Sequence, residues 1–313
     1  MRHQGISERS GVRAGLCRVW ALPPDETCAG EARRIFRRAV GGLALDAGVF
    51  DDALLMASEL AANTLHATEA ARTAVDADPG GEGDGTSPRT SPCTSPRAEL
   101  WLYLRGVGMT RELVCKVFDS YRGWLNGPPP EELTVDMDER GRGLRIVSEL
   151  SAGRWGYHPT RGRLGTWRLR GKAVWFAVPA PMAHPRLADV TGLRTYTQSV
   201  DVTADRMLAR MTPRGAAREL SEMLRERGFG KSAYTISEEP EDETTVLTFR
   251  HGTLLWCRPG SVTLTTPSGH WERWGCVDLI EVVEQAIRYH EEHEEHEELA
   301  AVRQREFATA VTA

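Results

Sequence analysis

Two short stretches carry residues whose types and spacing suit phosphate chemistry. The first, DERGRGLRIVSEL (138–150), places Gly141 and Gly143 directly before an apolar, helix-like run. Backbone N–H groups at the start of a helix are unpaired and attract anions, and glycines leave these groups uncovered. A helix N-terminal loop without any binding role also contains a single Gly-x-Gly. The stretch is therefore compatible both with a phosphate-binding loop and with an ordinary helix start.

The second stretch, DDALLMASELAANTLHATEA (51–70), predicts a helix with a polar stripe. Glu59, Asn63 and His66 recur at intervals of four and three residues, so they share one face of that helix. The opposite face is apolar and contains Leu54, Ala57, Ala61 and Leu65. Such a helix can pack on a sheet and present a carboxylate and a carboxamide to a cavity. On periodicity alone, a solvated helix face is the alternative.

Two further features follow along the chain in a fixed order. The apolar strand LVCKVFD (113–119) ends in the carboxylate of Asp119. The proline- and glycine-rich stretch 121–139 comes next and is long enough to form a lid. The glycine turn then leads into a predicted helix over 144–152.

The bulk composition indicates a globular protein with more than one domain. Its 313 residues, 41% of them apolar and 27% charged, are enough for a sizeable core, and we expect two domains at this length. A net charge of -5 argues against a general binder of nucleic acids or membrane surfaces. The six cysteines form no C-x-x-C pair, and no apolar run reaches membrane-spanning length. We therefore expect a cytoplasmic protein without a zinc ribbon, a disulfide framework or a membrane span.

Composition also divides the chain into segments. Residues 1–12 are predicted to be disordered, and a first domain covers 13–179. Within it, the low-complexity run of Gly, Pro, Ser and Thr predicts a flexible insertion at about 69–97. The proline-punctuated segment 180–190 is predicted to be a linker, and 191–313 a second domain.

Hydrophobic periodicity predicts alternating helices and strands in both domains. In the first domain we expect a strand at 16–22, helices at 23–43 and about 51–68, a strand pair within 98–120, and a second pair that turns at Gly171–Lys172. In the second domain we expect a helix at 212–228, strands at 233–237, 244–250, 253–258 and 261–266, and a helix from about 276. The run HEEHEEHEE near the end of this last helix favours a solvated acidic face over a zinc site, because it lacks both H-E-x-x-H and a cysteine.

The order of helix with Glu and Asn, strand ending in Asp, lid, and glycine turn into a helix resembles the GHKL ATPase superfamily. More narrowly, ASELAANTLHA, VFDS, DERGRGLRIVSELSAGRWGY and GKAVWFAVP resemble the anti-sigma-factor serine kinase branch in its actinobacterial form. These motifs run from about Trp20 to Pro179, and residues 188–313 carry no family resemblance. The implied fold is α+β, a two-layer α/β sandwich of the histidine-kinase-like ATPase type. It has a mixed or antiparallel sheet with helices on one face, and a smaller α+β domain follows it.

The resemblance implies a site for ATP and Mg²⁺. Asn63 would hold Mg²⁺ through its side-chain carbonyl, and Asp119 would accept the amino group of adenine. Glu59 would take the proton of an attacking hydroxyl that belongs to a serine on an antagonist protein. Gly141 and Gly143 would let backbone amides approach the phosphates.

The resemblance also implies roles for other residues of the motifs. Leu144 would continue the phosphate-contacting backbone, and Arg140 and Arg142 would either add positive charge there or only coat the surface. His66 would shape the pocket or simply pack. Of the two glycines in the D-x-G-x-G pattern of broader GHKL proteins, only the final one, Gly123, follows Asp119 here.

Two residues depart from the family pattern close to the expected base-binding position. Tyr121 stands where a glycine is usual, and Ala173 stands where the branch often has a threonine after Gly-Lys. Binding of nucleotide is therefore a safer expectation than phosphoryl transfer.

Three functions remain open on the sequence. The first is an anti-sigma-factor-like serine/threonine protein kinase that binds Mg-ATP and phosphorylates an antagonist. The second is a non-catalytic nucleotide-sensing module that docks a transcriptional regulator, and the third is a structural adaptor without nucleotide. A protein partner such as a sigma factor, and a homodimer, are expected by resemblance only. Neither nucleic acid nor a membrane is an expected partner.

Overall fold

The computed structural model describes residues 15–43, 45–76, 98–121, 142–164, 169–181, 210–239 and 243–312. These residues form two compact units. The first contains the described residues up to Tyr157 and those of 161–181, and the second contains His158–Thr160 and those from 210 onwards. The predicted disordered N-terminus and most of the predicted linker lie outside the described residues.

The first unit is built on a five-stranded sheet with the order β1-β2-β3-β5-β4. Its strands are β1 (Arg18–Leu22), β2 (Ala98–Arg105), β3 (Glu112–Asp119), β4 (Trp155–Arg161) and β5 (Arg170–Pro179). The β1–β2, β2–β3 and β3–β5 pairs are antiparallel. Strands β2 and β3 each lie between two neighbouring strands. Six successive residues of β2 and seven of β3 are buried.

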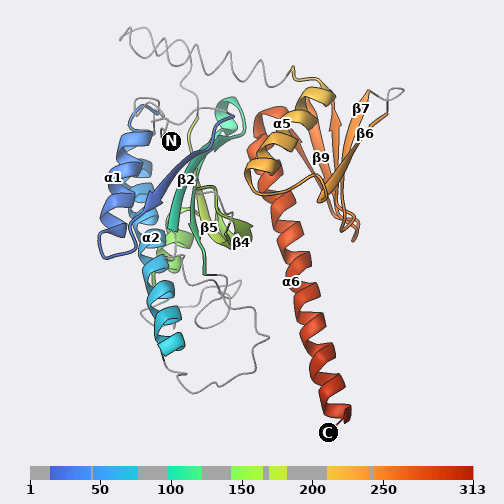
Figure 1. Cartoon of the computed structure of the whole chain (residues 1–313). Coiled ribbons are helices and arrows are strands. Elements are labelled where there is room, and N and C mark those ends of the chain that lie inside the picture. Colours follow the sequence, from blue (N-terminus) through green and yellow to red (C-terminus); the bar gives the residue numbers. More distant parts are fainter. Residues whose placement is uncertain are drawn as a thin grey trace, which may run out of the picture. The chain divides into compact units, whose positions relative to one another are not determined.

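Three helices cover one face of this sheet (Figure 1). They are α1 (Cys28–Val40), α2 (Ala47–Asp76) and α3 (Arg142–Leu150). Alternate residues of a strand point to opposite faces, so Cys115 and Val117 of β3 reach the helices together with Phe176 of β5. By the same alternation, Asp119 at the end of β3 lies on the helix-bearing face. A short 3-10 turn (Gly108–Thr110) joins β2 to β3.

The helix that carries Glu59 and Asn63 is longer than the sequence predicts. It begins at Ala47 rather than near Asp51. At this start, the side chain of Asp46 accepts a 2.9 Å hydrogen bond from the backbone N–H of Gly48. It also continues to Asp76, into the segment predicted to be flexible, because its alanines favour a helix. Residues 77–97 of that segment lie outside the described residues.

Two predictions about the end of the first unit are wrong. Gly171 and Lys172 lie inside β5 and do not form a turn, since β5 is one continuous strand that pairs with β3. The helix predicted over 144–152 begins at Arg142 and ends at Leu150, so Gly143 lies in its first turn. Ala152, predicted to be helical, has a left-handed φ of 52° just after the helix.

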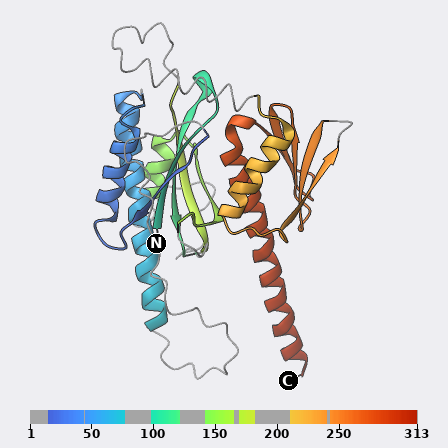
Figure 2. The ribbon, with the colours of Figure 1, turned by 45° about the horizontal axis from the view of Figure 1, so that its top comes forward.

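The second unit contains a five-stranded sheet of order β10-β9-β8-β7-β6, in which every pair of neighbours is antiparallel. Its elements are α5 (Pro213–Glu226), β6 (Tyr234–Glu239), β7 (Thr244–Phe249), β8 (Leu254–Arg258), β9 (Ser261–Thr265), β10 (Trp271–Gly275), a 3-10 turn (Cys276–Asp278) and α6 (Leu279–Thr312). Helices α5 and α6 lie on one face of the sheet (Figure 2). The predicted helices and four predicted strands are present, and β10 was not predicted.

The α+β class predicted from the sequence is confirmed, with two antiparallel sheets. Each unit has a hydrophobic core of its own, between its sheet and its helices. Within the described ranges, no helix combines the length and the apolar character that crossing a membrane requires.

Candidate functional site

Helix α2 presents Glu59 and Asn63 beside its buried face. Ala57, Leu60 and Ala61 are buried in the core, which fixes the rotation of the helix about its axis. Glu59 and Asn63, one turn apart, are each partly exposed. Neither side chain makes a hydrogen bond or an ion pair with any described residue. The helix therefore offers a carboxylate and a carboxamide that no side chain in this part of the structure satisfies.

Helix α3 brings Gly143 directly against this pair. A Cβ atom placed on Gly143 would lie 3.1 Å from Glu59 Oε2 and 3.4 Å from both Nδ2 and Oδ1 of Asn63. The two polar side chains thus lie close to Gly143, where a side chain would crowd them. This contact joins the two stretches that the sequence singles out.

The first turn of α3 contains three of the predicted residues. Arg142 is exposed, whereas Leu144 is only 8% exposed and packs in the core, where it anchors the helix. Because the first N–H groups of a helix have no intrahelical acceptor, the amides of this turn can bind an anion. Gly123, Arg140 and Gly141, also predicted to contact nucleotide, lie outside the described residues.

A second polar group of the first unit contains Asp119 and its two hydrogen-bond partners, Lys172 and Tyr121. Its Oδ2 accepts a 3.0 Å hydrogen bond from Lys172 Nζ, and its Oδ1 accepts a 2.9 Å bond from the backbone N–H of Tyr121. Lys172 Nζ also donates to the carbonyl of Tyr121 at 2.6 Å and lies 5.0 Å from the centre of its ring. Asp119 and Lys172 are cross-strand partners in the β3–β5 register, which explains their closeness.

Burial dominates the electrostatics of this pair. Loss of water raises the pKa of the Asp119 carboxyl, and the charge of Lys172 opposes that rise. Loss of water likewise lowers the pKa of the Lys172 ammonium, against the attraction of Asp119. Burial therefore favours the neutral form of each group, and each group favours the charged form of the other.

Both groups lie on the helix-bearing face of the first sheet. Helix α2 packs against α3 and against strands β3 and β5. Lys172 is the cross-strand partner of Asp119, whereas Ala173 pairs with Phe118 and points to the opposite face.

The sequence alone does not assign Lys172 to the site. The feature that could have indicated it is a lysine inside the apolar run GKAVWFAV. His66 lies in α2, beyond the last residue of that helix whose side chain is described.

The donor set fits a magnesium ion held by few protein ligands. Among the described residues there is no group of three or more His, Cys, Asp or Glu side chains placed to hold a metal. Mg²⁺ commonly takes one or two protein oxygens and completes its shell with water and phosphate oxygens. The unpartnered carboxamide of Asn63, beside the Glu59 carboxylate, suits that mode of binding.

The histidines of α6 form a separate cluster in the second unit. His290 Nδ1 lies 3.4 Å from Nδ1 of His251, in the turn between β7 and β8, and the ring of His293 stacks on the ring of His251. Burial lowers the pKa of His251 to about 4. Further along the helix, His296 and the glutamates after it are exposed, as the sequence predicts for a solvated acidic helix end. At the start of the same run the prediction is wrong, because Glu291 is only 1% exposed.

Comparison of the chain with protein-family models and with curated proteins finds no match. The likeness to the GHKL superfamily thus stays at the level of the motifs, and the function has to be argued from the site.

Proposed function

We propose that the first unit binds Mg-ATP between α2 and the start of α3. One observation carries the proposal: Glu59 and Asn63 have no described partner, and both lie within 3.4 Å of the position that a Cβ on Gly143 would take, at a helix start. Both side chains are partly exposed, so their polar atoms are accessible to a ligand that enters from solvent. A ligand with a bound cation and phosphate oxygens would satisfy both the side chains and the helix amides.

Each residue has a role in this proposal. Asn63 would hold Mg²⁺ through its side-chain oxygen, where the ion would supply positive charge beside the phosphates. The amides of Gly143 and Leu144 bind phosphate oxygens with the help of the helix dipole. The free lone pairs of the Asp119 carboxylate accept the adenine amino group, because each of its oxygens has only one partner in the described structure.

We propose further that the bound ATP serves as a phosphoryl donor to a protein serine. The serine oxygen attacks the γ-phosphorus, the bond from that phosphorus to the β–γ bridging oxygen breaks, and ADP leaves. Glu59 accepts the hydroxyl proton. The resemblance to anti-sigma-factor serine kinases supports this step, with an antagonist protein as the substrate and a sigma factor as a second partner.

A nucleotide sensor without catalysis is the second candidate. The observation that favours it is the altered loop after Asp119, where Tyr121 stands in place of the usual glycine and its backbone N–H and C=O are bonded to Asp119 and Lys172. In this version binding of ATP changes the docking of a protein regulator, and no phosphate is transferred.

Calorimetry on the full chain with Mg-ATP tests the proposed binding. We expect saturable heat, its loss in Asn63→Ala, and weaker selection of adenine over guanine nucleotides in Asp119→Ala. Glu149→Ala is the matched control, because that glutamate lies on the exposed face of α3 and pairs only with Arg145 in the described structure. Absence of heat with folded protein would overturn the proposed site.

Transfer of labelled γ-phosphate to a co-purified partner then separates the two candidates. The kinase version requires transfer that is lost in Glu59→Ala while that variant still binds ATP. Binding without transfer to any co-purified protein would overturn the kinase version and leave the sensor.

A further inference from the structure

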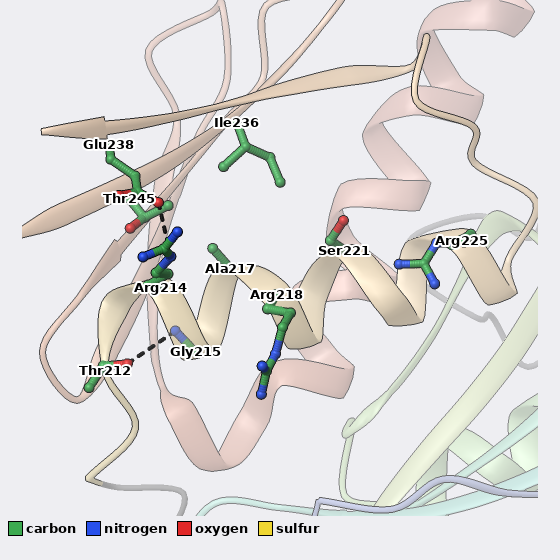
Figure 3. Close-up of a pocket in the computed structure, with 10 residues that line it drawn as sticks. All are labelled: Thr212, Arg214, Gly215, Ala217, Arg218, Ser221, Arg225, Ile236, Glu238 and Thr245. Atoms are coloured by element: carbon green, nitrogen blue, oxygen red, sulfur yellow. Dashed lines mark hydrogen bonds and ion pairs between the residues drawn. The ribbon is translucent and has the colours of Figure 1, made fainter.

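The second unit contains an open groove between α5 and the edge of its sheet (Figure 3). It has a volume of about 410 Å³. One wall is a face of α5 and the other is β6 with its neighbour β7. The residues that matter for its chemistry are Arg214, Arg218, Ser221, Arg225, Ile236 and Glu238.

The α5 wall is a stripe of cations. Arg214, Arg218 and Arg225 are separated by four and seven residues, which places them on one face of the helix. Arg218 and Arg225 are exposed, and neither makes an ion pair or a hydrogen bond with a described residue. Arg214 contacts Glu238 at 3.2 Å, but its side chain is 83% exposed, so this pair holds it weakly. The groove thus has three arginines and one carboxylate.

The opposite wall is a strand edge that has no neighbouring strand among the described residues. Strand β6 is the last in the sheet order, and its residues from Thr235 to Glu239 are all exposed. An edge strand has backbone N–H and C=O groups directed away from the sheet, which another strand can bind. Ile236 adds an apolar contact, since its side chain lies in the groove and is 48% exposed.

We infer that this groove binds an extended acidic peptide of a partner protein, which adds to β6 as a further strand and directs its carboxylates to the arginines of α5. Strand addition of this kind takes its affinity from main-chain hydrogen bonds and its specificity from alternate side chains.

The dimensions of the two walls agree with that ligand. From Arg214 to Arg225 the helix rises about 17 Å, which equals the length of about five residues of extended chain. Alternate side chains on a strand are about 6.6 Å apart, close to the rise of about 6 Å between Arg214 and Arg218. A second carboxylate, two residues along the peptide, can therefore meet Arg218. The rise from Arg218 to Arg225 is about 10.5 Å, between one and two such steps, and the long arginine side chain can cover the difference.

A small anion fits the same groove less well. The arginines are spread along the helix and do not converge on one point, and a free phosphate would use neither Ile236 nor the strand edge. The combination of cations, an apolar contact and free backbone groups matches a peptide.

Fluorescence anisotropy with the full chain and a labelled Thr-Glu-Val-Glu-Val-Glu-Thr peptide tests the inference. We expect saturable binding that falls at least tenfold when Arg218→Ala and Arg225→Ala are combined. Arg250→Ala, an exposed arginine in the turn after β7, is the control and should bind as the wild type does. A peptide with lysine in place of every glutamate should not bind.

Amide hydrogen exchange supplies the structural readout. Strand addition should slow exchange at β6, within 235–239, when the peptide is bound. Absence of binding at physiological salt, or binding without protection of β6, would overturn the inference. Equal competition by inorganic polyphosphate would also overturn it, because it would reveal a general anion site.

Discussion

Gly143 is the residue at which one added carbon would disturb the candidate site most directly. Its missing side chain leaves room for Glu59 Oε2 and for the Asn63 carboxamide, which a Cβ atom would approach to 3.1 and 3.4 Å. We expect Gly143→Ala to push both side chains away by a few tenths of an ångström and to weaken Mg-ATP binding about tenfold, equivalent to about 1.4 kcal/mol. Titration calorimetry measures this loss.

Gly30→Ala is the matched control for that substitution. Gly30 lies in α1, and no atom lies within 4 Å of the position that its Cβ would take. The change should raise stability by about 0.5–1 kcal/mol through helix propensity and leave nucleotide binding unchanged. Equal affinity of Gly143→Ala and Gly30→Ala would mean that Gly143 does not border the site.

The buried pair of Asp119 and Lys172 gives a second prediction at this scale. The two side chains are 7% and 8% exposed, so removing either charge leaves the other uncompensated. We expect Lys172→Met to lower the free energy of unfolding by about 3–5 kcal/mol, measured by urea denaturation at neutral pH. Replacing both charges, in Asp119→Asn with Lys172→Met, should restore most of this loss.

The loss in Lys172→Met should depend on pH in a defined direction. Burial already raises the pKa of Asp119, and without Lys172 the pKa rises further. A carboxyl with a raised pKa in the folded state destabilises the fold only when it is ionised. The gap between variant and wild type should therefore be small near pH 4 and widen as the pH rises to neutral. A gap independent of pH would contradict this account.

At the scale of elements, the close approach of β3 and β5 positions Asp119. A Cβ atom on Gly171 would lie 2.1 Å from the carbonyl oxygen of Asp119 and 2.7 Å from the ring of Phe118. Gly171→Ala must therefore separate the strands, and we expect it to lower the free energy of unfolding by about 3 kcal/mol or more. Gly42→Ala is the control, since nothing lies within 4 Å of its added carbon. Similar denaturation midpoints for the two variants would show that the strands do not need to be so close.

Apolar patterning was enough to predict most elements but not their exact limits. Strands β2 and β3 and helix α5 follow directly from their periodicity. Strand β4, with the sequence WGYHPTR, was missed because Gly156 and Pro159 are rare in strands and its pattern is weak. Gly171 was read as a turn residue, although close strand packing is what requires a glycine there.

The candidate site was only partly predictable for a related reason. Glu59 and Asn63 could be found from their helical spacing, and Gly143 from its place before an apolar run. The partnership of Asp119 with Lys172 depends on the β3–β5 register, which links residues 53 positions apart. A local sequence pattern does not show which residues of two strands pair, so Lys172 could not be assigned to the site from the sequence.

At the scale of the whole molecule, each of the two hydrophobic cores contains two buried cysteines, so the reactivity of these thiols measures the opening of each core separately. Cys28 and Cys115 are buried in the first unit, and Cys257 and Cys276 in the second. Burial raises the pKa of all four thiols, that of Cys257 to about 12. Since the thiolate is the reactive form, each should react only when its surroundings open.

Thiol labelling followed by mass spectrometry can therefore locate nucleotide binding without an active-site substitution. A ligand that binds only the folded state stabilises it by about 2.7 kcal/mol at a concentration 100 times its Kd, which slows labelling through unfolding about 100-fold. We expect Mg-ATP to slow labelling of Cys28 and Cys115 by about this factor and to leave Cys257 and Cys276 unchanged. Slowing of the second pair alone would place the nucleotide in the wrong unit for our proposal, and no slowing at any of the four would contradict binding altogether.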